Sequence, residues 1–170
     1  DVIKSRSGQT VEVGNTDAEG RLILADALTE ACNDNPEIVI DMATLTGAAR
    51  VALGPDVPVF FCTDDQIASE LVRIATAIHD PVWQLPLFQP YRQALNSEIA
   101  DICSTGGEGY GGAIVAALFL QSFVPSGLTW IHFDLMAWNL ITKPGKPKGG
   151  EAMAIRTIFE YLKRRFPIRF

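Results

Sequence analysis

The chain has 170 residues, 48% of them hydrophobic and 20% charged, with a formal net charge of −6. This composition is typical of one compact globular domain and excludes a disordered or fibrous chain. The richest apolar stretch, residues 113–124, falls short of the roughly 18 to 20 residues that a membrane-spanning helix needs, so no membrane partner is expected.

Basic residues are too localised to predict nucleic-acid binding. Lys163, Arg164, Arg165 and Arg169 gather near the C-terminus, and residues 1–140 carry no basic stripe. This group is more simply explained as compensation for the negative end of a last helix. Nucleic acid is therefore not expected as a partner.

The cysteine spacing indicates a reducing environment. Cys32, Cys62 and Cys103 are odd in number, far apart and without a CxxC pair. This pattern supports neither a disulfide framework nor a thiolate zinc site. We expect three buried apolar cysteines and a cytoplasmic location.

The chain begins with an alternation of strand and helix. Residues 9–13 have the alternating pattern of a short strand, and residues 38–42 form a short apolar run. Between them, Thr16 and Glu19 have the spacing of a capping box, which predicts the start of a helix. Residues 33–36, Asn-Asp-Asn-Pro, end that helix. Its apolar face consists of Leu22, Leu24, Ala25, Leu28 and Ala31.

Strand, helix and strand in this order predict a βαβ crossover, with residues 38–42 covered on both faces of the sheet. Residues 57–62 form another expected strand, which Pro58 places at the edge of the sheet or at the start of the strand. Residues 66–79 have helical periodicity. Residues 81–90 contain three prolines and are expected to form an ordered loop.

The second half of the chain adds a helix at residues 113–123, a strand at residues 129–135 and a helix at residues 151–166. Residues 143–150 form a loop between the last two. The predicted fold class is α/β, a mixed β-sheet flanked by helices. We expect a single domain spanning residues 1–170.

Two acids stand at the mouth of the first helix, in the segment NTDAEGRLILADAL. Asp17 and Glu19 lie two positions apart beside Gly20, and two converging carboxylates repel unless a cation lies between them. A divalent ion would take oxygen ligands from both. Alternatively, they are ordinary first-turn acids that favour the helix dipole. Spacing alone leaves both interpretations open.

Arg21 follows these acids at a place where a cation is unfavourable unless an anion receives it. It could pair with Asp17 or Glu19, or reach a small anion or a developing oxyanion. Residues 43–47, Ala-Thr-Leu-Thr-Gly, add polar groups where α/β sheets bind ligands. A turn with helix-capping threonines explains that segment as well.

Together these segments resemble the leucyl, or cytosol, aminopeptidases, a family of two-metal exopeptidases. Residues 15–28 resemble the family signature, and residues 41–48 resemble its next active-site loop. Residues 82–87 resemble a proline-rich stretch of the family, and residues 132–134, His-Phe-Asp, a late strand. The order and spacing of these segments hold over essentially the whole chain.

The resemblance implies a role for each matching residue. Asp17 and Glu19 would be metal ligands, with Glu19 bridging two ions and Asp17 binding one, also through its backbone carbonyl. Arg21 would be catalytic and hold a bicarbonate-like anion. Leu45 would contact the reacting carbonyl through its backbone. The pocket for the first side chain would be lined by Thr44, Gly47, Met136 and Asn139.

The cofactors implied by the resemblance are two divalent metal ions, zinc or manganese. Such ions bind the substrate amine, polarise the scissile carbonyl and lower the pKa of an attacking water. The implied substrates are peptides that lose their N-terminal amino acid. The intact protein would be a cytoplasmic hexamer whose active sites face an inner cavity.

One departure from the family pattern concerns ligands upstream of the signature. There the family supplies a metal-binding lysine, two further aspartates and a catalytic lysine, and none of these precedes Asp1. We therefore expect the C-terminal portion of the catalytic domain, inactive by itself. The alternative hypothesis is a non-catalytic assembly or interaction module, or a degenerate homologue.

A second departure is local. Met136 and Asn139 stand where many relatives have small residues, so the pocket floor could be bulkier and more polar and its preference shifted. A conservative change in packing is the alternative.

Residues 107–112 match GxGxxG but follow a poor strand, and the resemblance places them in a loop beside the active-site entrance, so no nucleotide site is expected. His79 and His132 are expected to be structural.

Overall fold

The structure is a computed structural model that describes residues 1–106 and 109–167. Its main sheet has four strands in the order β3-β7-β4-β5. Their bounds are Ile38–Ala43 for β3, Thr129–Asp134 for β7, Val59–Cys62 for β4 and Trp83–Gln84 for β5. Because β3 is parallel to β7 while β4 is antiparallel to it, the sheet is mixed, as predicted.

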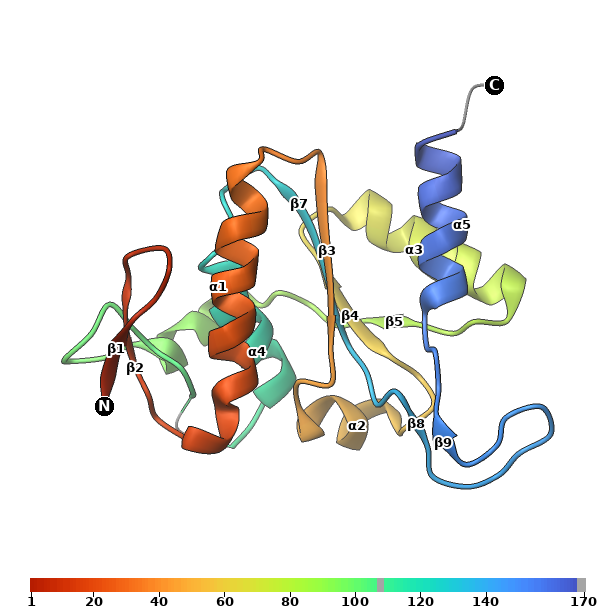
Figure 1. Cartoon of the computed structure of the whole chain (residues 1–170), viewed down its shortest axis with the longest axis horizontal. Coiled ribbons are helices and arrows are strands. Elements are labelled where there is room, and N and C mark those ends of the chain that lie inside the picture. The colour runs from red at the N-terminus through yellow and green to blue at the C-terminus, as the bar shows by residue number, and fades with distance from the viewer. Residues whose placement is uncertain (107–108, 168–170) are drawn as a thin grey trace.

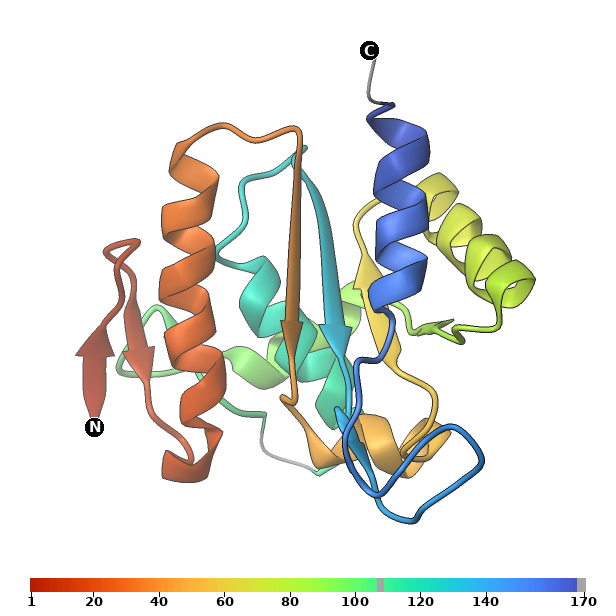
Figure 2. The ribbon, with the colours of Figure 1, turned by 45° about the vertical axis from the view of Figure 1, so that its right-hand side comes forward.

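Two pairs of helices cover the two faces of this sheet. The helices are α1 (Glu19–Asn33), α2 (Gly47–Leu53), α3 (Asp65–Ile78), α4 (Gly112–Gln121) and α5 (Ile155–Arg165). The pair α1 and α4 lies on one side of β3 and β7, and the pair α3 and α5 lies on the other (Figure 2). Alternate residues of β4 enter the two cores, Phe61 on the α1 side and Phe60 on the α3 side. The predicted fold class is therefore confirmed.

Short strands form two further sheets away from the main one (Figure 1). Their bounds are Val2–Lys4 for β1, Thr10–Glu12 for β2, Ile102–Cys103 for β6, Trp138–Asn139 for β8 and Gly149–Gly150 for β9. The strand β2 pairs with β1 and β6, not with β3. The predicted βαβ crossover within one sheet is therefore wrong, since the strands on either side of α1 belong to different sheets.

The positions of two strands in the main sheet agree in part with prediction. The strand β3 is the edge strand, but Val39 enters one core and Ile40 packs against the other, so both of its faces are covered, although Met42 near its end is 43% exposed. The strand β4 lies inside the sheet, and all four of its residues are buried. Pro58 precedes β4 and marks its start, because its missing N–H falls outside the ladder.

The start of α1 is built without the predicted capping box. A 3-10 turn, η1 (Thr16–Ala18), comes first, and the Asn15 side chain caps it by accepting from the Asp17 backbone N–H at 2.9 Å. The N-cap of α1 is Ala18, which has no capping side chain. This turn places Asp17 ahead of the helix and Glu19 at its first position.

The helices α3 and α4 lie close to their predicted ranges, α5 begins four residues later than predicted, and α2 had no predicted range. In α3, Asp64 caps the start of the helix, and His79 ends it in the left-handed conformation. The expected loop at residues 81–90 contains β5 and runs into a second 3-10 segment, η2 (Gln89–Leu95). Within residues 1–106 and 109–167, no helix is long and apolar enough to cross a membrane.

Candidate active site

The carboxyl ends of β3 and β7 lie side by side, with Ala43 opposite Asp134. Ligands of α/β proteins bind at such strand ends, because the loops that follow neighbouring strands converge there. The loop from β3 to α2 contains Thr44 and Leu45, and Met136 follows β7. Two predicted pocket segments that are distant in sequence are therefore brought together.

Asp134 anchors the loop that follows β3. Its carboxylate accepts hydrogen bonds from the backbone N–H of Leu45 and of Thr46, both at 3.1 Å, and from the Thr46 hydroxyl at 2.5 Å. Asp134 is only 2% exposed. The sequence interpretation gave it no role, although an acid at the end of an apolar strand was a signal that could have revealed it.

Arg21 extends from α1 toward the segment that follows β6. Its Nη1 donates to the Ser104 carbonyl oxygen at 2.7 Å. Burial lowers the pKa of the Arg21 guanidinium, and the charges of Asp134 and Cys103 oppose that shift. Among the described residues, Arg21 forms no ion pair with Asp17 or Glu19, so of the two alternatives for Arg21 the local salt bridge is not seen there.

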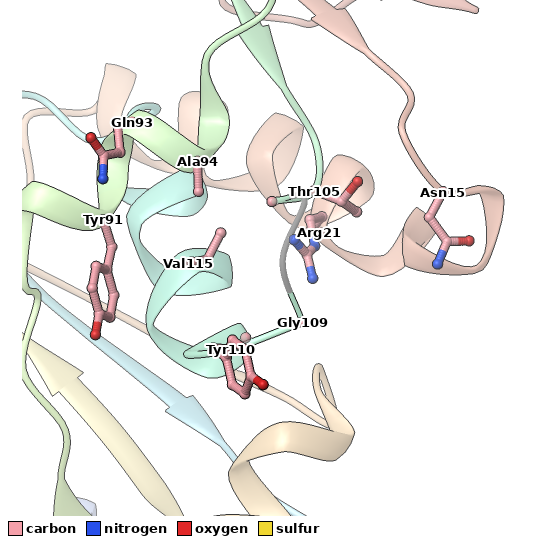
Figure 3. Close-up of a pocket in the computed structure, with 11 residues that line it drawn as sticks. Asn15, Arg21, Tyr91, Gln93, Ala94, Thr105, Gly109, Tyr110 and Val115 are labelled. Carbon is pink, nitrogen blue, oxygen red and sulfur yellow. The ribbon is translucent and has the colours of Figure 1, made fainter.

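A cavity of about 620 Å³ opens beside Arg21 (Figure 3). Tyr91 of η2 and Tyr110 form part of its wall, and the guanidinium of Arg21 lies near Thr105. Gly109 and Gly112 of the glycine-rich segment also line the cavity, whereas residues 107 and 108 of the motif lie outside the described residues. The cavity is therefore lined by the cationic side chain of Arg21 together with aromatic and polar groups.

Asp17 and Glu19 carry carboxylates that could bind a metal, but among the described residues no third acidic, His or Cys ligand stands with them. Both side chains are exposed at the start of α1. In the part of the chain that the structure describes, no group of three or more His, Cys, Asp or Glu could hold a metal ion. Carboxylate oxygens suit hard divalent cations. These two residues therefore fit a metal as part of a ligand set.

The four predicted pocket residues have different surroundings. Thr44 and Gly47 are exposed, and Met136 is half-buried. Asn139 is 2% exposed, and its amide nitrogen donates to Glu151 Oε2 at 2.5 Å and to the Pro147 carbonyl oxygen at 3.1 Å. The Asn139 amide therefore fastens the β8–β9 hairpin.

Arg50 is a residue that the sequence interpretation missed. It lies on α2, and its guanidinium contacts both pocket segments: Met136 Sδ at 3.6 Å and the Thr44 carbonyl oxygen at 3.5 Å. Nothing in the local sequence pattern predicts the contact to Met136, since Arg50 and Met136 are 86 positions apart.

His132 belongs to a buried polar group inside the sheet. Its Nδ1 lies 2.5 Å from Asp41 Oδ1, and the Trp130 indole N–H donates to Asp41 Oδ2 at 2.7 Å. The Trp130 and His132 rings stack with centroids 5.9 Å apart. These contacts support the predicted structural role of His132. His79 is exposed, and its carbonyl oxygen accepts from Arg156.

The cysteines agree in part with expectation. All three are free; Cys32 and Cys62 are buried, whereas Cys103 is only half-buried. Burial raises the pKa of the Cys62 thiol to about 11.

The sequence model of the cytosol aminopeptidase family, catalytic domain, matches residues 1–159. The chain is 44% identical over 167 residues to a probable cytosol aminopeptidase of Prochlorococcus marinus and 46% identical over 166 residues to one of Chlorobium phaeobacteroides. These alignments cover 97% and 96% of the chain. The chain belongs to the cytosol aminopeptidase family, whose members are hydrolases that act as exopeptidases.

Solved structures agree with this assignment. The crystal structure of the cytosol aminopeptidase of Coxiella burnetii superposes with a TM-score of 0.94 at 52% identity over 98% of this chain. A K354E mutant of tomato leucine aminopeptidase gives 0.85 at 43% identity over 96% of this chain. The bottromycin maturation enzyme BotP, in complex with Mn, gives 0.90 at 37% identity over 97% of this chain.

The chain spans about a third of the length of these relatives. It covers 34% of the Prochlorococcus protein and 33% of the Chlorobium protein. For the solved structures the covered shares are 36% of the Coxiella chain, 32% of the tomato chain and 37% of BotP.

Proposed function

We propose that the complete protein containing this chain is a metal-dependent aminopeptidase that releases N-terminal amino acids from peptides. The observation that carries this proposal is the grouping of Asp17, Glu19 and Arg21 at the start of α1, with Arg21 reaching a cavity beside Ser104. Membership of the cytosol aminopeptidase family supports it.

The cofactors in this proposal are two divalent ions, zinc or manganese. Glu19 would bridge both ions, and Asp17 would bind one of them. When bound, divalent ions supply Lewis acidity and a water of lowered pKa. The solved structure of BotP in complex with Mn supports manganese as one candidate.

Arg21 is the proposed anion-binding residue of the site. It is held by Ser104 and lies in the field of Asp134, which fixes a positive charge at the cavity wall. A cation in a partly buried place stabilises negative charge that develops on a substrate. A bicarbonate-like anion would be the partner of Arg21 before substrate binds.

Leu45 is proposed to contact the substrate through its backbone, and Thr44, Gly47, Met136 and Asn139 to line the pocket for the first side chain. The Leu45 N–H already donates to Asp134. We therefore expect the contact from Leu45 to come from its carbonyl oxygen, which would orient an N–H of the substrate.

The proposal extends to assembly and location. The complete protein would be a cytoplasmic homo-hexamer, and the names of its relatives as cytosol aminopeptidases support the location. The 170-residue chain by itself would be inactive, because Asp17 and Glu19 supply only part of two metal sites.

Hydrolysis of leucyl-p-nitroanilide, with and without added Mn²⁺, tests these proposals. We expect metal-dependent release by the complete protein and none by a mass-verified 170-residue chain. Turnover by the short chain would refute the incomplete site, and no turnover by the metal-loaded complete protein on any aminoacyl-anilide would refute the aminopeptidase.

A further inference from the structure

Arg50 is a cation without a strong acceptor at the ends of β3 and β7. Its contact to the Thr44 carbonyl oxygen is long, at 3.5 Å, and its contact to Met136 Sδ, at 3.6 Å, is to a thioether, which is a weak acceptor. Its Nε is buried and has no hydrogen-bond partner within the described ranges. The guanidinium therefore retains one unpaired donor, the Nε–H group, that is shielded from water.

Several more exposed arginines of the chain pair with carboxylates, and the partly buried Arg21 and Arg92 donate to neutral oxygen acceptors at 2.7–2.8 Å. Arg6 pairs with Glu30, Arg164 with Glu160 and Arg165 with Glu37. Arg50 forms no such pair with the carboxylates that the structure describes. A partly buried guanidinium is stabilised most by a carboxylate, which accepts two parallel hydrogen bonds from it.

Both contacts of Arg50 belong to the expected pocket for the first side chain, so this inference rests on the proposed aminopeptidase function. We propose that Arg50 is a specificity-determining residue that binds the side-chain carboxylate of an acidic N-terminal residue. The substrate class is then peptides that begin with glutamate or aspartate.

The surroundings of Arg50 favour exchange of its present contacts for a substrate carboxylate. Met136 is unbranched and flexible, and its sulfur is easily displaced by a better acceptor. A leucine side chain in the same pocket would exclude water and leave the guanidinium donors unpaired. A site built around a hydrogen-bonding group discriminates strongly against a substrate that lacks the partner.

The test compares glutamyl- and leucyl-p-nitroanilide as substrates of the complete, Mn²⁺-loaded protein. We expect a higher kcat/KM for the glutamyl substrate. Arg50→Met should lower the glutamyl-to-leucyl ratio of kcat/KM about 10- to 100-fold, as expected for loss of a charged hydrogen bond. Arg50→Lys should retain part of the preference. Arg73→Met, on the exposed face of α3, is the matched control and should leave the ratio unchanged.

The outcomes separate the two proposals. Hydrolysis of neither substrate would refute the aminopeptidase function. Hydrolysis of the leucyl substrate with the same glutamyl-to-leucyl ratio in wild type and Arg50→Met would overturn the role of Arg50 alone. If Arg50→Met does not fold, the wild type decides: free glutamate should inhibit leucyl-anilide hydrolysis more strongly than free leucine, and the reverse order would overturn the inference.

Discussion

The two sides of the candidate site differ in how firmly the chain holds them. On the side of β3 and β7, Asp134 is buried and accepts three hydrogen bonds from Leu45 and Thr46. On the side of α1, Asp17 in the 3-10 turn and Glu19 at the first position of α1 are both exposed. Folding therefore fixes the loop after β3 in advance, whereas in the proposed site the acids would take their final geometry only with a bound cation.

Glu19→Gln should have the largest effect of these variants, lowering activity without lowering the stability of the fold. We expect kcat/KM of the complete protein to fall about 1,000-fold, because a metal contributes several kcal/mol of transition-state stabilisation. The free energy of unfolding without metal should change by less than about 0.5 kcal/mol, as for other exposed sites. Anilide hydrolysis and urea denaturation measure the two quantities. A variant that keeps a tenth of the activity would show that Glu19 is not a ligand.

Asp134→Ala should release the loop that follows β3 and lower the free energy of unfolding. The backbone N–H groups of Leu45 and Thr46 would lose their acceptor, and we expect a loss of about 2–4 kcal/mol. Urea denaturation of the complete protein measures this loss. Asp134→Asn keeps one acceptor oxygen and should cost less, and Asp17→Ala is the exposed control. Equal losses in the free energy of unfolding for Asp134→Ala and Asp17→Ala would contradict the claim that the chain holds the two sides differently.

Asp41→Asn tests the buried hydrogen bonds between β3 and β7, the two strands that carry the Asp134 side of the site. The Asn oxygen can still accept from Trp130, but the charge that faces His132 is lost, and we expect a cost of about 1–2 kcal/mol. Trp130→Phe removes only the indole N–H and serves as a partner variant. Additive costs in the double variant would argue against one connected network.

The buried thiol of Cys62, on β4, should make the stability of the fold depend on pH. Because burial raises its pKa to about 11 in the folded state, its contribution to stability is complete below the ordinary thiol pKa. It is lost as pH rises from that value through the folded pKa, since only the unfolded thiol ionises in this window. Cys62→Ala should flatten the decline in stability between about pH 9 and 11. An unchanged pH profile in urea denaturation would contradict this assignment.

Ala137→Gly should have the smallest effect, a slight increase in the free energy of unfolding. Ala137, next to Met136, has a φ of 53° in the left-handed region, which costs a residue with a Cβ about 1 kcal/mol. We expect a stabilisation of about 0.5–1 kcal/mol in thermal denaturation. Ala27→Gly, in the interior of α1, should instead destabilise by a similar amount.

Local patterns in the sequence were enough to predict α1, α3, α4, α5 and the long strands, but not the short helix α2. The range of α3 was predicted from its periodicity, which acts within a few residues. The pairing of β2 with β6 and the inner position of β4 did not follow, because periodicity does not encode which strands are neighbours.

The site shows the same division between local and distant information. Asp17, Glu19 and Arg21 stand in one segment, so their grouping was visible in the sequence. The roles of Asp134 and Arg50 were not visible, because each depends on a contact between residues more than 80 positions apart.

The hydrogen bonds of Asp134 also bear on when the site forms during folding. They join residues that are 88 and 89 positions apart, and β3 reaches β7 only after α2, α3 and α4 have intervened along the chain. Contacts of such high sequence separation form slowly, because loop-closure entropy must be overcome before they add stability. The loop at Leu45 and Thr46 should therefore become ordered late, after the helices have nucleated.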